Sequence, residues 1–151
     1  MVDAWRILAG ITDPEIPVIS ITELGIVREV TQAANALEVA ITPTYSGCPA
    51  MHVIEQEIVE RLTQAGYAEV RVRTVLAPAW STDWIAPAAR DKLTAYGIAP
   101  PGRVNLYPRS VTCPRCGAAR TERVSEFGST ACKAHYRCLE CLEPFDYFKP
   151  L

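Results

Sequence analysis

Two Cys-x-x-Cys motifs near the C-terminal end constrain the fold of this chain most strongly. The motifs are Cys113 to Cys116 and Cys138 to Cys141, and 21 residues separate them. At this spacing, two rubredoxin-like turns can close a tetrahedral site of four thiolates. The segment is too short to bury an adequate apolar core, so a bound metal can supply folding free energy that burial cannot. The sequence therefore predicts a four-cysteine ribbon with structural zinc, and iron is the alternative metal because four thiolates also suit it.

The composition is that of a globular chain without a dominant charge. The 151 residues carry a net charge of −2, and 49% of them are hydrophobic, with no run long enough to span a bilayer. Neither nucleic acid nor a membrane is therefore expected as a partner. The N-terminus lacks the basic and apolar blocks of a signal peptide, which predicts a cytoplasmic protein. In that reducing compartment the six cysteines are expected to be metal ligands or free thiols rather than disulfides.

A group of helix-breaking residues marks a boundary before the ribbon. The segment Ala99-Pro100-Pro101-Gly102 ends a helical pattern and begins an extended stretch. We therefore expect an N-terminal domain over residues 1–100, a linker over 101–110 and the zinc ribbon over 111–151.

Hydrophobic periodicity predicts an α+β fold for the N-terminal domain. Leu37, Val39 and Ile41 alternate with polar or small residues, as in a half-buried strand, whereas Ile54 and Ile58 recur at helical spacing. The expected elements are an amphipathic stretch over 2–8, a rigid loop over 12–17, strands over 26–31 and 37–42, a helix over 49–64, a strand over 69–75 and a helix over 87–96. They predict a small three-stranded sheet with helices covering one face, followed by the small β ribbon.

Cys48 carries the chemical signal of the N-terminal domain. It follows a glycine loop that leaves a strand, and it precedes Pro49 at the start of a helix. The free amides and the positive dipole end of that helix favour an anion, so the thiolate is stabilised and can serve as a nucleophile or a metal ligand. The alternative is a small buried apolar residue. His52, on the first turn of the same helix, is a candidate second ligand or proton shuttle, with surface packing as the alternative.

Three further motifs occur in an order that resembles the SufT-like metal-sulfur cluster assembly domain. They are the loop Asp13-Pro14-Glu15, the strand entry Leu24-Gly25-Ile26-Val27 and the turn Cys48-Pro49, and Pro78-Ala79-Trp80 fits the end of that domain. The resemblance covers nearly all of residues 1–99. It implies an iron-sulfur cluster assembly fold and a role for Cys48 in holding iron or a cluster.

The two modules together are similar to the D (or J) subunits of bacterial phenylacetyl-CoA epoxidase. The match covers the full length. It includes the segment from Phe127 to Ala134, which lies between the two Cys-x-x-Cys turns, here called knuckles. The resemblance implies an accessory role in aerobic phenylacetate degradation, in which other subunits carry the di-iron oxygenase and the flavin and iron-sulfur reductase. The chain has only two histidines and no paired Glu-x-x-His motifs, so a di-iron site of its own is not expected.

Asp13 and Glu15 have two possible roles. They can act in acid-base chemistry or as hard ligands beside Cys48, but Asp-Pro is also a common turn and helix-start device. The sequence does not separate these alternatives.

In the ribbon, Cys132 is a fifth thiol away from both knuckles. It can be a spare ligand, a redox-active thiol or a buried core residue, and free cysteine is among the most buried residue types. Phe145, Tyr147 and Phe148 are expected to form the small core of the ribbon.

The main functional hypothesis is a non-catalytic maturation subunit. In this hypothesis Cys48 holds iron or an iron-sulfur cluster transiently and passes it to another epoxidase subunit, with the cluster of the reductase as the expected recipient. One cysteine supplies too few thiolates for a cluster, so two copies of the chain in a homodimer or small thiols must complete the coordination. The alternatives are a purely structural adaptor that bridges epoxidase subunits and, third, a thiol enzyme with Cys48 as nucleophile and His52 as base.

Overall fold

The computed structural model describes residues 2–45, 47–102 and 111–150. The chain divides into two compact units, Met1–Trp80 and Ser81–Leu151. No helix in the described part of the chain is both long enough and apolar enough to cross a membrane.

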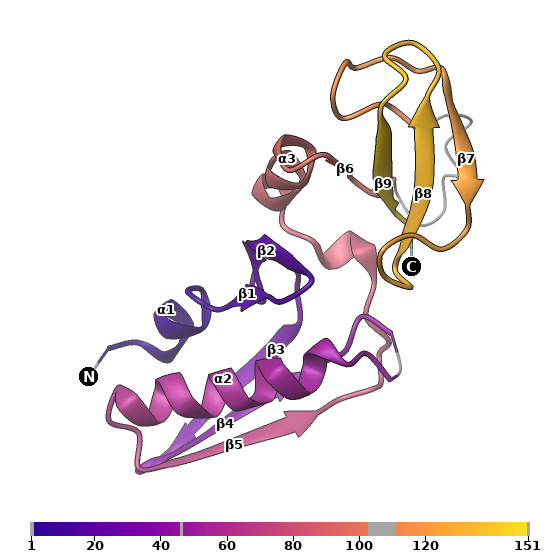
Figure 1. Ribbon diagram of the computed structural model, residues 1–151. Helices are drawn as coiled ribbons and strands as arrows, with labels where there is room; N and C mark the ends of the chain where they lie inside the picture. The colour runs from indigo at the N-terminus through magenta and orange to yellow at the C-terminus, as the bar shows by residue number, and fades with distance from the viewer. Residues whose placement is uncertain (1, 46, 103–110, 151) are drawn as a thin grey trace. The chain divides into compact units, whose positions relative to one another are not determined.

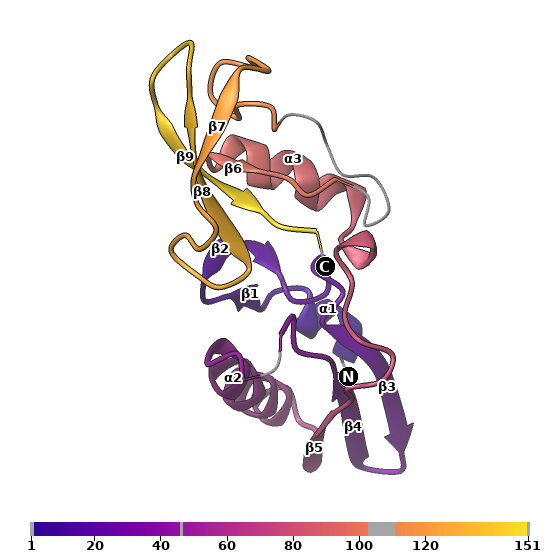
Figure 2. The ribbon, with the colours of Figure 1, turned by 90° about the vertical axis from the view of Figure 1, so that its right-hand side faces the viewer.

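The first unit contains a three-stranded mixed sheet, a two-stranded sheet and two helices, and their arrangement can be followed in Figure 1. Strands β3 and β4 form a hairpin, and the parallel strand β5 pairs with the other edge of β4, so the sheet order is β3-β4-β5. The hairpin is clear in Figure 2. The elements of this unit are α1 (Ala4–Leu8), β1 (Thr12–Asp13), β2 (Ile16–Ser20), β3 (Val27–Ala33), β4 (Ala36–Ile41), α2 (Ala50–Gln64) and β5 (Glu69–Thr74).

Helix α2 lies across one face of this sheet (Figure 1) and contributes one side of the core of the unit. Ile54, Ile58 and Leu62 recur at the spacing of one helix face and are fully buried. On β4, Leu37 and Val39 alternate with less buried neighbours and are buried as well. The predicted strands, helix and α+β class are thus confirmed for this part of the chain.

The segment over residues 12–17, for which a rigid loop is expected, is instead part of a two-stranded sheet. The carboxylate oxygen Oδ1 of Asp13 accepts hydrogen bonds from the amides of Glu15 (2.7 Å) and Ile16 (3.2 Å). This tight turn reverses the chain, so β1 pairs antiparallel with β2. The prediction of a loop was wrong. It rests on the turn signal of Asp13 and Pro14, and it overlooks the strand that contains Ile16 and Ile19, both of which are buried on β2.

The second unit is a four-stranded sheet preceded by a helix. The sheet order is β6-β9-β8-β7, with β6 parallel to β9 and the other pairs antiparallel. Its elements are the short 3₁₀ helix η1 (Thr82–Trp84), α3 (Pro87–Ala95), β6 (Ile98–Ala99), β7 (Thr121–Ser125), β8 (Lys133–Cys138) and β9 (Pro144–Phe148).

The division between the units differs from the expected domain boundary at residue 100. Ile98 pairs with Asp146 and Ala99 pairs with Tyr147, so β6 is an edge strand of the ribbon sheet. Helix α3 contacts β6 and belongs to the same unit. Prolines mark where a helix ends but carry no information on which sheet the next strand joins. Most of the expected linker over residues 101–110 lies outside the described residues.

Gly97 ends helix α3 in a conformation that suits glycine. Its φ is +87°, and a Cβ atom built there would lie 3.1 Å from the guanidinium nitrogen Nη2 of Arg115. We expect Gly97→Ala to lower the free energy of unfolding of the second unit by about 1–2 kcal/mol, because alanine strains the left-handed backbone and crowds Arg115. Chemical denaturation measures this loss. In the double variant with Arg115→Ala, Gly97→Ala should cost less free energy of unfolding than it does in the native chain. If the effects of the two substitutions on that free energy are strictly additive, the proposed crowding is contradicted.

Candidate metal centre and the Cys48 loop

The four knuckle cysteines converge on one point, as their spacing predicted. Their sulfur atoms all lie within 4.8 Å of one another. The Sγ atoms of Cys113 and Cys141 are 3.8 Å apart, and those of Cys116 and Cys138 are 3.5 Å apart. A tetrahedral ion with zinc–sulfur bonds of about 2.3 Å requires sulfur atoms about 3.8 Å apart. The four thiolates therefore fit a single tetrahedral metal ion, and they form a metal-binding site.

Backbone hydrogen bonds shape both knuckles in the same way. The amide of Cys113 donates to the carbonyl of Ala118 at 2.9 Å, and the amide of Cys138 donates to the carbonyl of Glu143 at 3.0 Å. In the first knuckle, Gly117 has a φ of +78°, which lets the chain reverse tightly around the metal position. The two knuckles thus present their sulfur atoms from equivalent turns.

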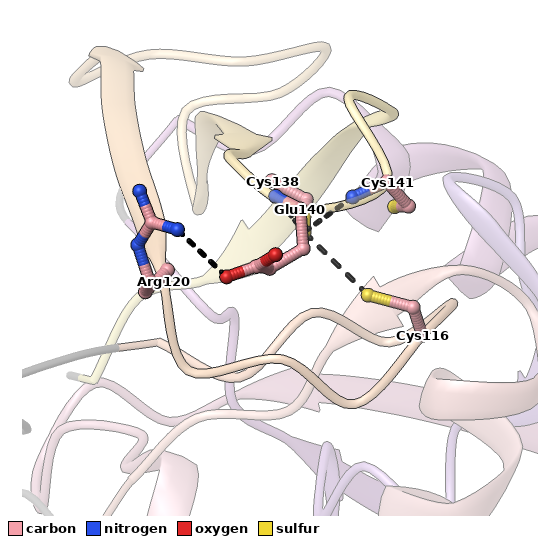
Figure 3. A network of polar contacts seen from close by, with 5 residues as sticks. All are labelled: Cys116, Arg120, Cys138, Glu140 and Cys141. Carbon is pink, nitrogen blue, oxygen red and sulfur yellow. Dashed lines mark hydrogen bonds and ion pairs between the residues drawn. The ribbon is translucent and has the colours of Figure 1, made fainter.

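Amide groups of the knuckles also point at the sulfur atoms. The amides of Glu140 and Cys141 donate to Cys138 Sγ at 3.4 and 3.5 Å, and the amide of Arg115 donates to Cys113 Sγ at 3.4 Å. Figure 3 shows this network around Cys138. Such donors stabilise a thiolate more than a thiol, and at Cys138 they favour the ionised ligand.

The pKa values of the second knuckle show how strongly these thiols interact. Burial raises the pKa of Cys138, but the amides of Cys141 and Glu140 outweigh it and lower the pKa to about 7. The amide of Glu143 lowers the pKa of Cys141, yet lost hydration and the neighbouring thiols raise it to about 12. Four thiolates this close repel one another, and a bound divalent cation removes that repulsion.

An exposed ion pair holds the second knuckle against the chain that follows the first. Arg120 forms an ion pair with Glu140 (Figure 3). The distance between Arg120 Nη1 and Glu140 Oε1 is 2.8 Å, and the amide of Leu139 donates to the carbonyl of Arg120 at 2.8 Å. This pair is not among the residues predicted from the sequence. The sequence gives only a weak signal for this ion pair, because Arg120 after one motif and Glu140 inside the other are equally compatible with two separate, solvated side chains.

Two of the four ligands are also part of the ribbon core. Cys113 and Cys138 are buried in one apolar cluster with Phe145 and Tyr147, and the ring of Tyr136 packs against both aromatic residues. Phe148 is buried too. The prediction that these tail aromatics form the core of the ribbon is confirmed. The metal site and the core share residues, so the order of one depends on the other.

Cys132 lies outside the four-cysteine group. It is 4% exposed, and its Sγ atom lies 3.0 Å from the hydroxyl oxygen of Thr130. Of the three roles considered for this thiol, the structure agrees with that of a buried core residue.

Cys48 lies in the turn between β4 and α2. Its side chain is half-buried, and its carbonyl accepts a hydrogen bond from the amide of Met51 at 3.2 Å. Pro49 is the N-cap of α2; it supplies no capping side chain, and the first turn of the helix contains no acidic residue. The amides at this helix end therefore have no side-chain cap, and the positive end of the helix dipole lies next to the Cys48 loop.

The other candidates of the N-terminal domain have different surroundings. Asp13 is buried, and its carboxylate shapes the turn between β1 and β2. Glu15 is half-buried in that turn, and His52 is exposed on the first turn of α2. Among the described residues, the fold gathers only the four knuckle cysteines into a group of three or more potential ligands. It does not gather Cys48, Asp13, Glu15 and His52 in this way.

Two protein families match different parts of this chain, one in the N-terminal part and one in the C-terminal part. The family described as "Iron-sulfur cluster assembly protein" matches residues 2–77, and the family described as "PaaD zinc beta ribbon domain" matches residues 99–149. Fold and site thus define a protein with an iron-sulfur cluster assembly domain followed by a metal-binding ribbon.

A curated relative identifies the family of the whole chain. This relative, from Escherichia coli (strain K12), is provisionally named as the D subunit of 1,2-phenylacetyl-CoA epoxidase. It is 51% identical over 150 residues, which cover 97% of this chain and 91% of the relative. The chain belongs to the family of these D subunits. The resemblance seen in the sequence motifs is confirmed.

Solved structures share the fold over part of the chain. The domain of unknown function DUF59 from Bacillus anthracis is 28% identical, with a TM-score of 0.56, and the match covers 60% of this chain and 87% of that structure. A conserved hypothetical protein from Thermotoga maritima is 25% identical, with a TM-score of 0.52, and the match covers 60% and 90% of the two chains. These likenesses agree with the predicted α+β assembly fold.

Proposed function

We propose that this chain is an accessory, non-catalytic subunit of a phenylacetyl-CoA epoxidase and that it helps to mature an iron or iron-sulfur site on a partner subunit. The observation that carries this proposal is the position of Cys48, at the uncapped start of α2 within the matched assembly domain. The name of the 51% identical relative supports the assignment to the epoxidase. The recipient in this proposal is the iron-sulfur cluster of the reductase subunit.

The coordination at Cys48 must be completed by other groups. Iron-sulfur clusters are commonly held by four thiolates, and Cys48 supplies one. A second copy of the chain or small thiols can add the remaining sulfur ligands, while Asp13, Glu15 and His52 are the hard-ligand or proton-transfer candidates of the same domain. Incomplete coordination by one chain suits a carrier, because a labile cluster is released more easily than one held by four fixed thiolates.

The ribbon has a different task in this proposal. Its four thiolates would hold zinc as a structural ion, which orders the knuckles and presents them to the partner subunit. Zinc has no redox chemistry of its own, so the ribbon would contribute binding and not electron transfer.

A structural adaptor is the second candidate function. It is favoured by the gathering of the four knuckle cysteines into one site, in which Cys48 has no part. For an adaptor the knuckles are essential and Cys48 is dispensable.

Anaerobic reconstitution with iron and sulfide separates the two candidates. We expect charge-transfer bands in the visible spectrum of the native chain, and we expect Cys48→Ser to lose them while retaining its ribbon metal. Cys132→Ser is the matched control, because it also removes one thiol outside the knuckles and should keep the bands. Bands of equal strength in the native chain and in Cys48→Ser would contradict a role for Cys48, and the absence of bands in the native chain would favour the adaptor.

A further inference from the structure

The two knuckles use equivalent turns but place different residues at the same position. In each turn, the amide of the first cysteine donates to the carbonyl five residues later, from Cys113 to Ala118 and from Cys138 to Glu143. The residue four positions after the first cysteine is left-handed in both turns. It is Gly117 in the first knuckle, with a φ of +78°, and Leu142 in the second, with a φ of +63°.

Neither backbone geometry nor packing accounts for a leucine at this position. The left-handed region disfavours residues with a Cβ atom, and glycine adopts it freely, as Gly117 does. Leu142 is also 70% exposed, the highest exposed fraction of any large hydrophobic side chain in the described parts of the chain. The side chain therefore contributes little to the folded ribbon, although its presence strains the turn. An exposed apolar side chain is ordinary by itself, but at a residue held in the left-handed region it suggests a role outside the chain itself.

Two glutamates lie close to Leu142 in the sequence. Glu140 and Glu143 flank it closely in sequence, and both are exposed. Glu140 pairs with Arg120, whereas the carboxylate of Glu143 makes no ion pair or side-chain hydrogen bond with any described residue. Four thiolates around one divalent cation would give the metal site, which both knuckles form, a net charge of about −2. Leu142 is thus an apolar projection next to one carboxylate, that of Glu143, which has no ion-pair partner among the described residues.

We propose that Leu142 is a docking anchor, which inserts into an apolar pocket with a basic rim on another subunit of the epoxidase. A single large apolar side chain that enters a desolvated pocket can dominate an interface, and charge complementarity at its rim raises the association rate. The inference depends on the proposed function only in taking the partner to be an epoxidase subunit. It concerns the second knuckle and is independent of whether Cys48 carries iron.

Binding of the full-length chain to each of the other purified subunits of the same organism's phenylacetyl-CoA epoxidase tests this proposal. We expect Leu142→Gly to weaken the dissociation constant for one of those subunits by about tenfold or more. The variant should keep the full metal content and should not unfold at a lower temperature, since glycine suits the left-handed turn. Leu76→Ser is the control, because Leu76 is 66% exposed in the first unit; its binding should match that of the native chain.

A charge variant gives a second, independent measurement. Glu143→Lys should slow association with the same subunit and reduce the salt dependence of binding, because it reverses the sign of the free rim charge. Native affinity in Leu142→Gly would overturn the proposal, and so would loss of metal in that variant, which would make Leu142 a structural part of the knuckle. If the native chain binds none of the subunits, the docking proposal is also wrong, whereas iron transfer through Cys48 is judged separately by reconstitution.

Discussion

Removal of the ribbon metal is expected to unfold the four-stranded sheet of the second unit and to leave the first unit folded. Cys113 and Cys138 are metal ligands that also lie in the core with Phe145 and Tyr147, so the loss of the ion releases both the knuckles and the core. Structural zinc contributes on the order of 10 kcal/mol in small zinc domains, more than a core of this size can supply. Without the ion, the close thiols also lose the positive charge that balances them.

Hydrogen exchange measured before and after chelation tests this expectation. Amides of β8 and β9 should lose their protection, and those of α2 should keep it. Cys138→Ser should behave like the chelated chain, with less than one metal ion bound per chain. Cys132→Ser provides the control, because Cys132 is buried in the same unit but lies outside the metal site. Protected β8 and β9 amides in the metal-free chain would show that the core of the ribbon is sufficient by itself.

Ile58→Ala is expected to lower the free energy of unfolding of the first unit by about 2–5 kcal/mol. Ile58 is fully buried on the face of α2 that covers the sheet, between Ile54 and Leu62 along the helix. The substitution leaves a cavity that these neighbours can fill only in part, because each is itself tightly packed. For a small domain, a loss of this size is a large fraction of its total stability.

Denaturant titration of the first unit, followed by the amide signals of β4 and β5, measures this effect. Val59→Ala is the matched control on the adjacent position, where the side chain is 39% exposed. Its effect should stay within about 0.5 kcal/mol, since exposed positions away from special features change stability little. Equal losses for the two variants would mean that α2 does not pack on the sheet through the Ile58 face.

The sequence determined the elements whose signals are local. The alternation of Leu37, Val39 and Ile41 predicts β4, and the helical spacing of Ile54 and Ile58 predicts α2, because side-chain periodicity follows from the geometry of a single element. The metal site was predictable for the same reason: the ligands of each knuckle lie three residues apart, and one turn positions both. Cys48 was placed correctly before α2 because the start of a helix is a local signal as well.

Only the tertiary structure decided which segments pair over long distances in the chain. The pairing of β6 with β9 assigns α3 to the second unit. The sequence pattern around Ile98 does not predict that this residue pairs with Asp146. Burial of Asp13 in a turn likewise depends on how β1 and β2 pair. The left-handed backbone of Leu142 and its exposure appear only when the turn is closed around the metal site. Local patterns determine elements and ligands, whereas strand pairing and exposure arise from contacts between segments that are distant in the sequence.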